Sequence, residues 1–175
     1  MTHTVELEAS FLAASIPAEL KACPHVEIED VYFPASAEHA RTRIRRKDDE
    51  YEFTKKVRVN PEDAGYQQEF NIDLTAEEYA ALATGEGKKV SKVRYYLPYE
   101  DLTAEVDIFS RILSGLVIVE FEFNSLKEKE SFVMPDFCLA DVTQEKFIAG
   151  GVLAGKSYHD LEPTLTSFGY NALIL

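Results

Sequence analysis

Acidic and basic side chains recur at every second position in several segments of the chain. Because the side chains at i and i+2 of a β-strand point to the same face, this spacing would collect them on one side of a sheet. Acids and bases are sorted by segment, whereas an ordinary solvated face mixes them. The same-face acids are Glu6, Glu8, Glu69, Glu105, Asp107, Glu120 and Glu122. The same-face bases are Arg41, Arg43, Arg45, Lys56, Lys92 and Arg94.

This sorting of charge predicts a site for an anion and a metal ion. Neighbouring carboxylates repel by roughly 4 kcal/mol at 4 Å with an effective dielectric near 20, so a counter-ion is needed. Carboxylates without His or Cys partners favour hard ions such as Mg²⁺ or Mn²⁺, and arginine and lysine match phosphate oxygens. A chain of linked phosphates would satisfy both sets. For any single pair, such as Glu105 and Asp107, an ordinary salt bridge on a wet sheet face is an equally good explanation.

The charges lie on segments that alternate apolar and polar residues with the two-residue period of a strand. Eight such segments are predicted as strands, at 3–12, 26–33, 39–47, 50–59, 65–74, 88–99, 103–109 and 115–124. Short turn sequences join several of them, so we expect an antiparallel meander. Closed into an eight-stranded barrel, these strands would bring the charges around one lumen with room for a small ligand.

Helices are expected to interrupt the strands and to pack outside the barrel on its apolar face. They are predicted at 16–22, 75–83 and 125–132 and in pieces between 142 and 168. Thr75 and Glu78 have the spacing of a capping box at the start of the second helix. The fold class is therefore mainly β, of the α+β type.

Composition limits the classes of protein to consider. The chain has 175 residues, 46% apolar and 28% charged, which is typical of one globular domain over 1–175. Within it we expect barrel strands over about 3–124 and a helical segment over about 125–175. The net charge of −13 argues against nucleic acid as the main partner.

No segment has the features of a membrane anchor. The longest apolar run, at 115–119, is far too short for a membrane helix, and polar residues follow Met1. We therefore expect a cytoplasmic protein without a membrane partner. An outer-membrane barrel would share the polar interior, but the intervening helices and the lack of aromatic girdles argue against that class.

Some motifs suggest other chemistry and are better explained structurally. Residues 150–157, GGVLAGKS, match the P-loop pattern, but helical-looking sequence precedes them where a P-loop needs a strand. We interpret Gly155 as a helix break and Ser157 as the N-cap of the next helix. The two cysteines, Cys23 and Cys138, are too few for a disulfide framework or a four-ligand zinc site. Four histidines lack metal-ligand spacing and are expected on the surface: His3, His25, His39 and His159.

Several motifs in order along the chain carry a family resemblance. They are Glu6-Leu7-Glu8 in VELEASFL, then ARTRIRRKDDEYEFTKK, KVRYY, AEVDIF, GLVIVEFEF and PDFCLADVT. From residue 4 to about 154 the chain resembles the CYTH domains, or triphosphate tunnel metalloenzymes, and is most similar to the short bacterial inorganic triphosphatases. The resemblance implies an eight-stranded antiparallel tunnel that hydrolyses a triphosphate, most simply inorganic triphosphate, with Mg²⁺ or Mn²⁺.

The resemblance also implies roles for individual residues. Glu6, Glu8 and Glu120 match carboxylates that hold a first metal ion. Asp107 and Glu122 match carboxylates near a second ion, with Glu69 and Glu105 as further candidates. Glu8, Lys56 and Glu122 would be catalytic. The residues expected to bind the triphosphate are Arg43, Arg45, Lys56, Lys92, Arg94 and Lys146.

The chain departs from the family pattern at three motifs. Ser10 replaces the lysine that follows the paired glutamates, Asn71 replaces an acid of the fifth strand, and Phe147 and Gly150 replace a basic residue and an asparagine. A protein with fewer cations could bind a polyphosphate or nucleotide with little or no turnover. It could also prefer thiamine triphosphate or a nucleoside triphosphate, although an adenylate cyclase would need an adenine pocket that the sequence does not locate.

The C-terminal sequence TLTSFGYNALIL is apolar enough to form a packing surface. We expect it to pack either on the barrel or on a second subunit of a homodimer.

Overall fold

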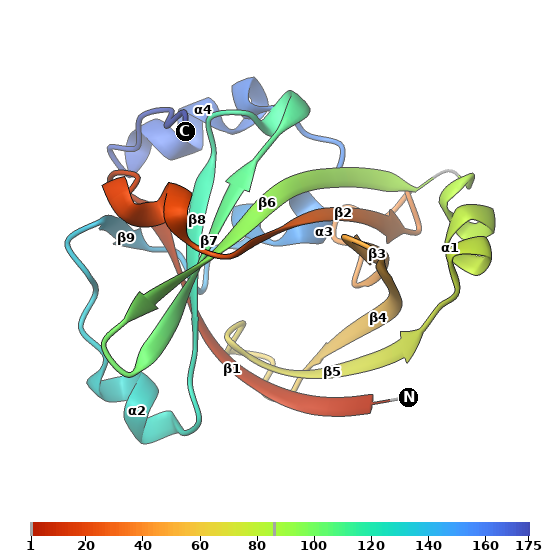
Figure 1. Cartoon of the computed structure of the whole chain (residues 1–175), viewed down its shortest axis with the longest axis horizontal. Coiled ribbons are helices and arrows are strands. Elements are labelled where there is room, and N and C mark those ends of the chain that lie inside the picture. The colour runs from red at the N-terminus through yellow and green to blue at the C-terminus, as the bar shows by residue number, and fades with distance from the viewer. Residues whose placement is uncertain (1, 86) are drawn as a thin grey trace.

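The computed structural model describes residues 2–85 and 87–175. Among them, nine strands form one antiparallel sheet in the order β5-β4-β3-β2-β6-β7-β8-β1-β9. The strands are β1 (Thr2–Ala13), β2 (His25–Phe33), β3 (Thr42–Lys47), β4 (Glu50–Arg58), β5 (Tyr66–Asp73), β6 (Lys88–Tyr99), β7 (Leu102–Phe109), β8 (Val117–Glu122) and β9 (Cys138–Asp141). An additional pairing of β1 with β5 closes the first eight strands into the predicted barrel (Figure 1).

Strand β1 closes the barrel by changing partners along its length. Residues 2–7 pair with β5, and residues 8–12 pair with β8. The short strand β9 then pairs with the end of β1 outside the closed ring. It was not predicted, because four residues are too few to show an alternating pattern.

Strand β3 is shorter than predicted, beginning at Thr42 rather than at residue 39. Just before it, Ala40 lies against the short helix α3 (Gly150–Leu153), and Arg41 keeps one backbone hydrogen bond to β4, accepting from the N–H of Lys56 at 3.2 Å. An added Cβ on Gly151 would lie 1.8 Å from the carbonyl oxygen of Ala40. Residues 39–41 therefore line the end of the barrel as a connection.

The helices form close to the predicted places. α1 (Ala76–Ala83) begins with the predicted capping box of Thr75 and Glu78, and Ser125 caps α2 (Leu126–Ser131). The helix predicted at 16–22 is a 3-10 helix, Ala18–Ala22. Two further 3-10 turns, Arg111–Leu113 and Lys146–Ile148, and α4 (Tyr158–Ser167) complete the described helices. No helix among residues 2–85 and 87–175 is long and apolar enough to cross a membrane.

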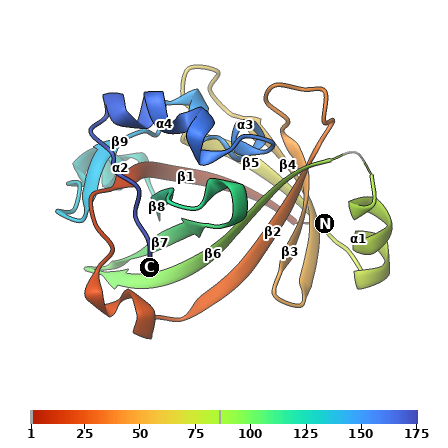
Figure 2. The ribbon, with the colours of Figure 1, turned by 90° about the horizontal axis from the view of Figure 1, so that it is seen from above.

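The apolar core lies largely outside the barrel, because the strands turn their charged faces inward. One cluster covers the outer faces of β1, β7 and β8, where Phe121 packs against Phe132 just after α2. Tyr79 of α1 packs against Val31 and Ile44 on β2 and β3. A third cluster joins α3 and α4 to one end of the barrel (Figure 2).

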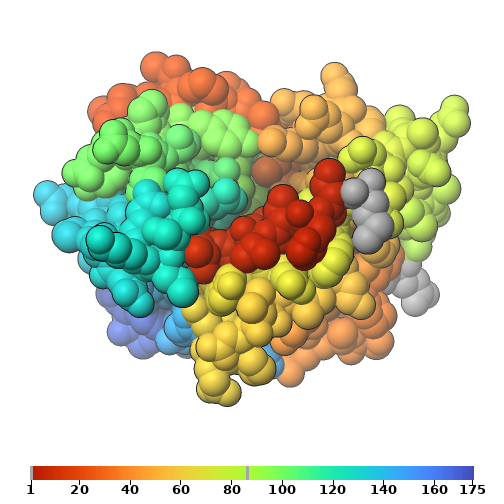
Figure 3. Space-filling view, turned by 90° about the horizontal axis from the view of Figure 1, so that it is seen from below, coloured from red at the N-terminus to blue at the C-terminus, as the bar shows by residue number. Residues whose placement is uncertain are grey.

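The predicted helical cover is incomplete over the first half of β1. Val5, expected on the apolar outer face, is 51% exposed. In Figure 3 this half of the strand crosses the lower face without a helix above it. The helices therefore cover other parts of the barrel and leave the first half of β1 to solvent.

The C-terminal segment packs on the barrel. The hydroxyl of buried Tyr170 donates to the carbonyl oxygen of Gly115 (2.7 Å) and accepts from the backbone N–H of Val117 (2.8 Å). The N–H of Leu173 donates to the same carbonyl oxygen at 2.9 Å. These bonds fix the start of β8.

The P-loop-like sequence is a helical turn and a helix start, as interpreted from the sequence. Gly155, with a φ of +83°, follows α3 as a helix break, and Ser157 caps α4 in a capping box with Asp160. The 3-10 turn Lys146–Ile148, not a strand, precedes this sequence.

We expect Gly151→Ala to lower the free energy of unfolding by about 2 kcal/mol or more, because the new Cβ would overlap the backbone of Ala40. Gly85→Ala is the matched control, since its Cβ would meet its nearest neighbour at an ordinary 3.4 Å. Urea unfolding of both variants measures the difference. Equal stability would show that α3 is not seated against residue 40.

Candidate active site

The barrel encloses a cavity of about 330 Å³, and half of the residues that line it are charged. All the residues predicted for the site line it. They are Glu6, Glu8, Arg43, Arg45, Lys56, Glu69, Lys92, Arg94, Glu105, Asp107, Glu120, Glu122 and Lys146. The two-residue period of the strands thus brings them together as predicted, while their individual roles stay predictions.

A carboxylate that the sequence reasoning missed holds the arginines of β3. Asp30 on β2 accepts two hydrogen bonds from Arg45, from Nε at 2.7 Å and from Nη2 at 2.8 Å. The Nε atom of Arg43 lies 3.9 Å from the same carboxylate. Burial alone would raise the pKa of Asp30, but Arg45 and Arg43 outweigh it and hold the pKa well below its usual range. Asp30 is therefore a fixed negative charge, only 2% exposed.

The two faces of β2 explain why Asp30 was missed. Its same-face neighbours are Ile28 and Tyr32, and adjacent Val31 on the opposite face is also buried. The strand therefore shows no clean alternation. The available signal was a carboxylate that directly precedes the apolar residues Val31, Tyr32 and Phe33, because a charge drawn into such a stretch needs a partner.

Lys56 on β4 bridges three carboxylates from β1 and β5. Its Nζ lies 2.6 Å from Glu6, 3.1 Å from Glu69 and 3.9 Å from Glu8. Burial opposes the charge of Lys56, but Glu8 and Glu6 raise its pKa. Burial likewise opposes the charge of Glu69, but Lys56 and Arg43 lower its pKa to about 2. Lys56 and Arg43 thus neutralise this part of the wall only in part.

Arg94 on β6 likewise pairs with several carboxylates, here from β7 and β8. It forms a two-bonded pair with Asp107 (both 2.7 Å), reaches Glu120 at 2.5 Å, and also pairs with Glu105. Lys92 donates to the same Asp107, which is 1% exposed. Burial opposes the charge of Asp107, but Arg94 and Lys92 lower its pKa to about 2. Asp107, a predicted metal ligand, is thus engaged by two cations here.

Glu8 and Glu122 are the least neutralised carboxylates of the wall. They are direct cross-strand partners on β1 and β8. Burial raises the pKa of Glu8, and Glu120 and Glu6 raise it further despite Lys56. The pKa of Glu122 is raised by burial and then by Glu105 and Glu8. Glu122 forms no ion pair with any residue that the structure describes.

The donor chemistry of this acidic group fits a hard divalent cation. Carboxylate oxygens that raise one another's pKa are relieved by an added positive charge. Among residues 2–85 and 87–175, no three His, Cys, Asp or Glu side chains already form a ready metal site. The other carboxylates of the wall point instead to Lys56 and Arg94, so holding an ion would require some of them to leave their basic partners.

The residues that depart from the family pattern have different surroundings in the structure. Ser10 lines the cavity beside Glu120 and is buried, with its N–H bonded to Thr143. Asn71 donates to Glu69 at 2.8 Å, and Phe147 packs on Phe168 in the core. An added Cβ on Gly150 would lie 2.0 Å from the hydroxyl oxygen of Tyr32.

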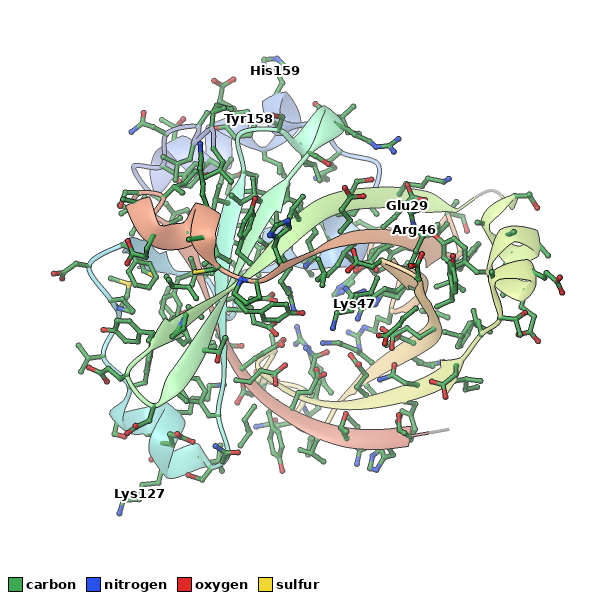
Figure 4. All side chains as sticks on the ribbon, viewed as in Figure 1. Glu29, Arg46, Lys47, Lys127, Tyr158 and His159 are labelled. Atoms are coloured by element: carbon green, nitrogen blue, oxygen red, sulfur yellow. The ribbon has the colours of Figure 1, made fainter. Side chains whose placement is uncertain are left out.

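One histidine expected on the surface lies elsewhere, and Lys146 is only at the edge of the site. His39 is half-buried and lines the cavity, so its expected place on the surface was wrong, because the connection before β3 folds over the barrel end. His159 is on the outer surface as expected (Figure 4). Lys146 lines the cavity but is exposed and pairs with exposed Glu38 at 2.9 Å.

Comparison with known proteins finds similar chains of matching length. An inorganic triphosphatase from Nitrosomonas europaea is 34% identical over 152 residues, covering 85% of this chain and 96% of that protein. A crystal structure of an inorganic triphosphatase has a TM-score of 0.63 and 27% identity, covering 85% of this chain and 93% of that chain. A putative adenylate cyclase from Bacillus halodurans shares the fold, with a TM-score of 0.57, 17% identity, and coverage of 100% and 95% of the two chains. No protein-family model matches the chain.

We expect Asp30→Asn to lower the free energy of unfolding by about 3 kcal/mol, because it leaves Arg45 and Arg43 as buried, uncompensated charges. Asp101→Asn, at an exposed turn, should change it by less than about 0.5 kcal/mol. Urea unfolding at pH 7 compares the two. An Asp30→Asn protein as stable as the control would contradict the role of Asp30 as the partner of these arginines.

Proposed function

Because the chain belongs to the CYTH domain family, the triphosphate tunnel metalloenzymes, we propose that it hydrolyses inorganic triphosphate inside its barrel and releases phosphate. One observation carries the proposal: a closed barrel holds phosphate-binding bases and a group of under-neutralised carboxylates on the wall of the same cavity. The similar inorganic triphosphatases agree with this chemistry.

The bases of the wall bind the triphosphate, and those that share their carboxylates do so by exchanging partners. Arg43, Arg45, Lys56, Lys92 and Arg94 each lie within 4.0 Å of at least one carboxylate oxygen. A triphosphate offers several negative oxygens at once, so it can replace carboxylates that are held by single contacts. Guanidinium groups match pairs of phosphate oxygens, and lysine adds a compact charge.

The carboxylates that lose a basic partner become available to a metal ion. Glu6, Glu8 and Glu120 would hold a first Mg²⁺ or Mn²⁺, and Asp107 and Glu122, with Glu69 and Glu105 as further candidates, would be available to a second ion. The chemistry that such an ion supplies when bound is neutralisation of phosphate charge and activation of water. The remaining work of the wall is to position the phosphate chain and the attacking water.

Hydrolysis requires water to attack the terminal phosphorus in line with the bridging oxygen that leaves. Glu122 is suited to accept the proton of this water at a carboxylate oxygen, because it has no basic partner among the described residues and its pKa is raised. Lys56 and Arg94 neutralise the charge that develops on the departing diphosphate. Glu8 lies opposite Glu122 and completes the acidic side.

A second candidate function, binding without efficient turnover, is favoured by Ser10. This residue replaces the lysine expected from the family pattern and lies next to Glu120 across the β1–β8 pair. Without that lysine, the acidic side has one cation fewer to stabilise charge during the reaction. The same wall could then hold a polyphosphate while hydrolysing it slowly.

The direct experiment is phosphate release from inorganic triphosphate, ATP and thiamine triphosphate with Mg²⁺, Mn²⁺ or EDTA. We expect release from inorganic triphosphate that EDTA abolishes. Glu122→Gln should lower kcat by 100-fold or more, the usual effect of losing a general base. Glu130→Gln, on the exposed surface of α2, is the matched control.

The outcomes separate the two candidate functions. Metal-dependent release that Glu122→Gln removes would support hydrolysis. No release from any substrate, together with a rise of the melting temperature on adding triphosphate, would contradict hydrolysis and support the binding function.

A further inference from the structure

Four bases at every second position, Arg41, Arg43, Arg45 and Lys47, line the cavity. Arg43, Arg45 and Lys47 share one face of β3. Arg41 directly precedes the strand, and its carbonyl oxygen accepts a hydrogen bond from the N–H of Lys56 on β4 at 3.2 Å. The row therefore extends beyond the two central arginines at both ends.

The two central members of the row differ from the two end members in charge compensation. Arg45 pairs with Asp30 at 2.7 Å, and Arg43 lies 3.7 Å from Glu69. In the part of the chain that the structure describes, neither Arg41 nor Lys47 has a carboxylate within ion-pair distance. The uncompensated positive charge of the row thus lies at its ends.

At the Arg41 end, a second arginine joins from β4. Arg58 lines the same cavity and donates Nη1 to the carbonyl oxygen of Pro61 at 2.8 Å, with no ion pair among the described residues. His39 lines the cavity between these groups. Its pKa is lowered by burial and then by Arg41, Arg58 and Lys146, which shows that the three cations converge on one place.

The acids near this end only partly offset the cations. Glu38 is exposed and pairs with Lys146, and Asp63 contacts Lys129 at 3.7 Å. Glu145 lines the cavity and is exposed. Arg41 and Arg58 keep positive charge at one end of the cavity in a protein whose net charge is −13. Such a local field attracts an anion that the rest of the surface repels.

We propose that Arg41 and Arg58 form an additional phosphate subsite at this end of the cavity, which binds the phosphates beyond the third of a linear polyphosphate. This inference rests on the proposed function, because the interior bases must hold the other phosphates of the same chain. Arg41 is two residues before Arg43 and lines the same cavity, so a longer phosphate chain would meet further cations beyond the interior bases.

Lys47 provides a matched control at the opposite end of the row. Its side chain points into the space enclosed by the strands (Figure 4). Its Nζ lies 5.7 Å from the ring centre of Tyr96. Lys47 is therefore a cation of the same row whose neighbours differ from those of Arg41. Lys47→Gln removes one charge from the cavity and leaves the Arg41 end intact.

Calorimetric titration with inorganic triphosphate and linear tetraphosphate tests the subsite. It is done in EDTA at one fixed salt concentration, which screens long-range attraction. We expect wild type to bind tetraphosphate more tightly than triphosphate. Arg41→Gln/Arg58→Gln should weaken tetraphosphate binding about tenfold or more and triphosphate binding less than threefold. Lys47→Gln should preserve the ratio of the two affinities.

Either of two results would overturn the proposal: the double variant weakens both ligands by the same factor, or wild type does not distinguish them. Circular dichroism and the melting temperature of each variant confirm that it is folded. Because binding is measured without turnover, the two proposals fail separately. A protein that discriminates the two chain lengths but hydrolyses neither contradicts only the proposed function. One that hydrolyses triphosphate but binds both alike contradicts only the subsite.

Discussion

The structure depends on neutralising many charged side chains inside a closed barrel. A buried charge is costly unless an opposite charge compensates it, so each acid of the wall needs a base within reach. The strand order supplies this for most of them, because β3 and β4 bring bases next to the acids of β2 and β5, and β6 does the same for β7 and β8. Glu122 is an exception, with no ion pair among the described residues. The alternating pattern that turns charges inward also turns apolar residues outward. The main apolar packing therefore forms outside the barrel, which explains why helices and the C-terminal segment are needed there.

The ion pairs of the wall are of two kinds, and the difference matters for binding. Buried Asp30 accepts two hydrogen bonds from Arg45, so the position of this arginine is fixed before any ligand binds. Lys56 is shared among three carboxylates, and Arg94 is shared among Asp107, Glu105 and Glu120. Shared partners can be given up one at a time. A polyphosphate that takes over the bases frees carboxylates for a cation, so anion and cation binding should favour each other.

Much of this architecture could be predicted from the sequence, because a two-residue period determines which side chains share a face. That rule placed the predicted bases and acids on one wall, and the family resemblance implied that the eight strands close into a barrel. The rule could not predict β9, which is too short to show a period. It also could not predict the role of Asp30, because this part of β2 is buried on both faces. The position of His39 depends on the contact between residue 40 and Gly151, and such a contact between distant segments leaves no local pattern. The pairing of Asp107 with Arg94 depends on side-chain geometry, which strand alternation does not specify.

The central claim is that the charged wall binds triphosphate by exchanging its internal ion pairs for an anion and a cation. It is tested most directly by calorimetric titration of inorganic triphosphate into the wild-type protein and into Arg45→Ala, each with and without Mg²⁺ at equal ionic strength. The account predicts one triphosphate per chain, tighter binding in the presence of Mg²⁺, and weak binding to Arg45→Ala under both conditions. Binding that is indifferent to Mg²⁺ and to the loss of Arg45 would place the ligand elsewhere and contradict the account.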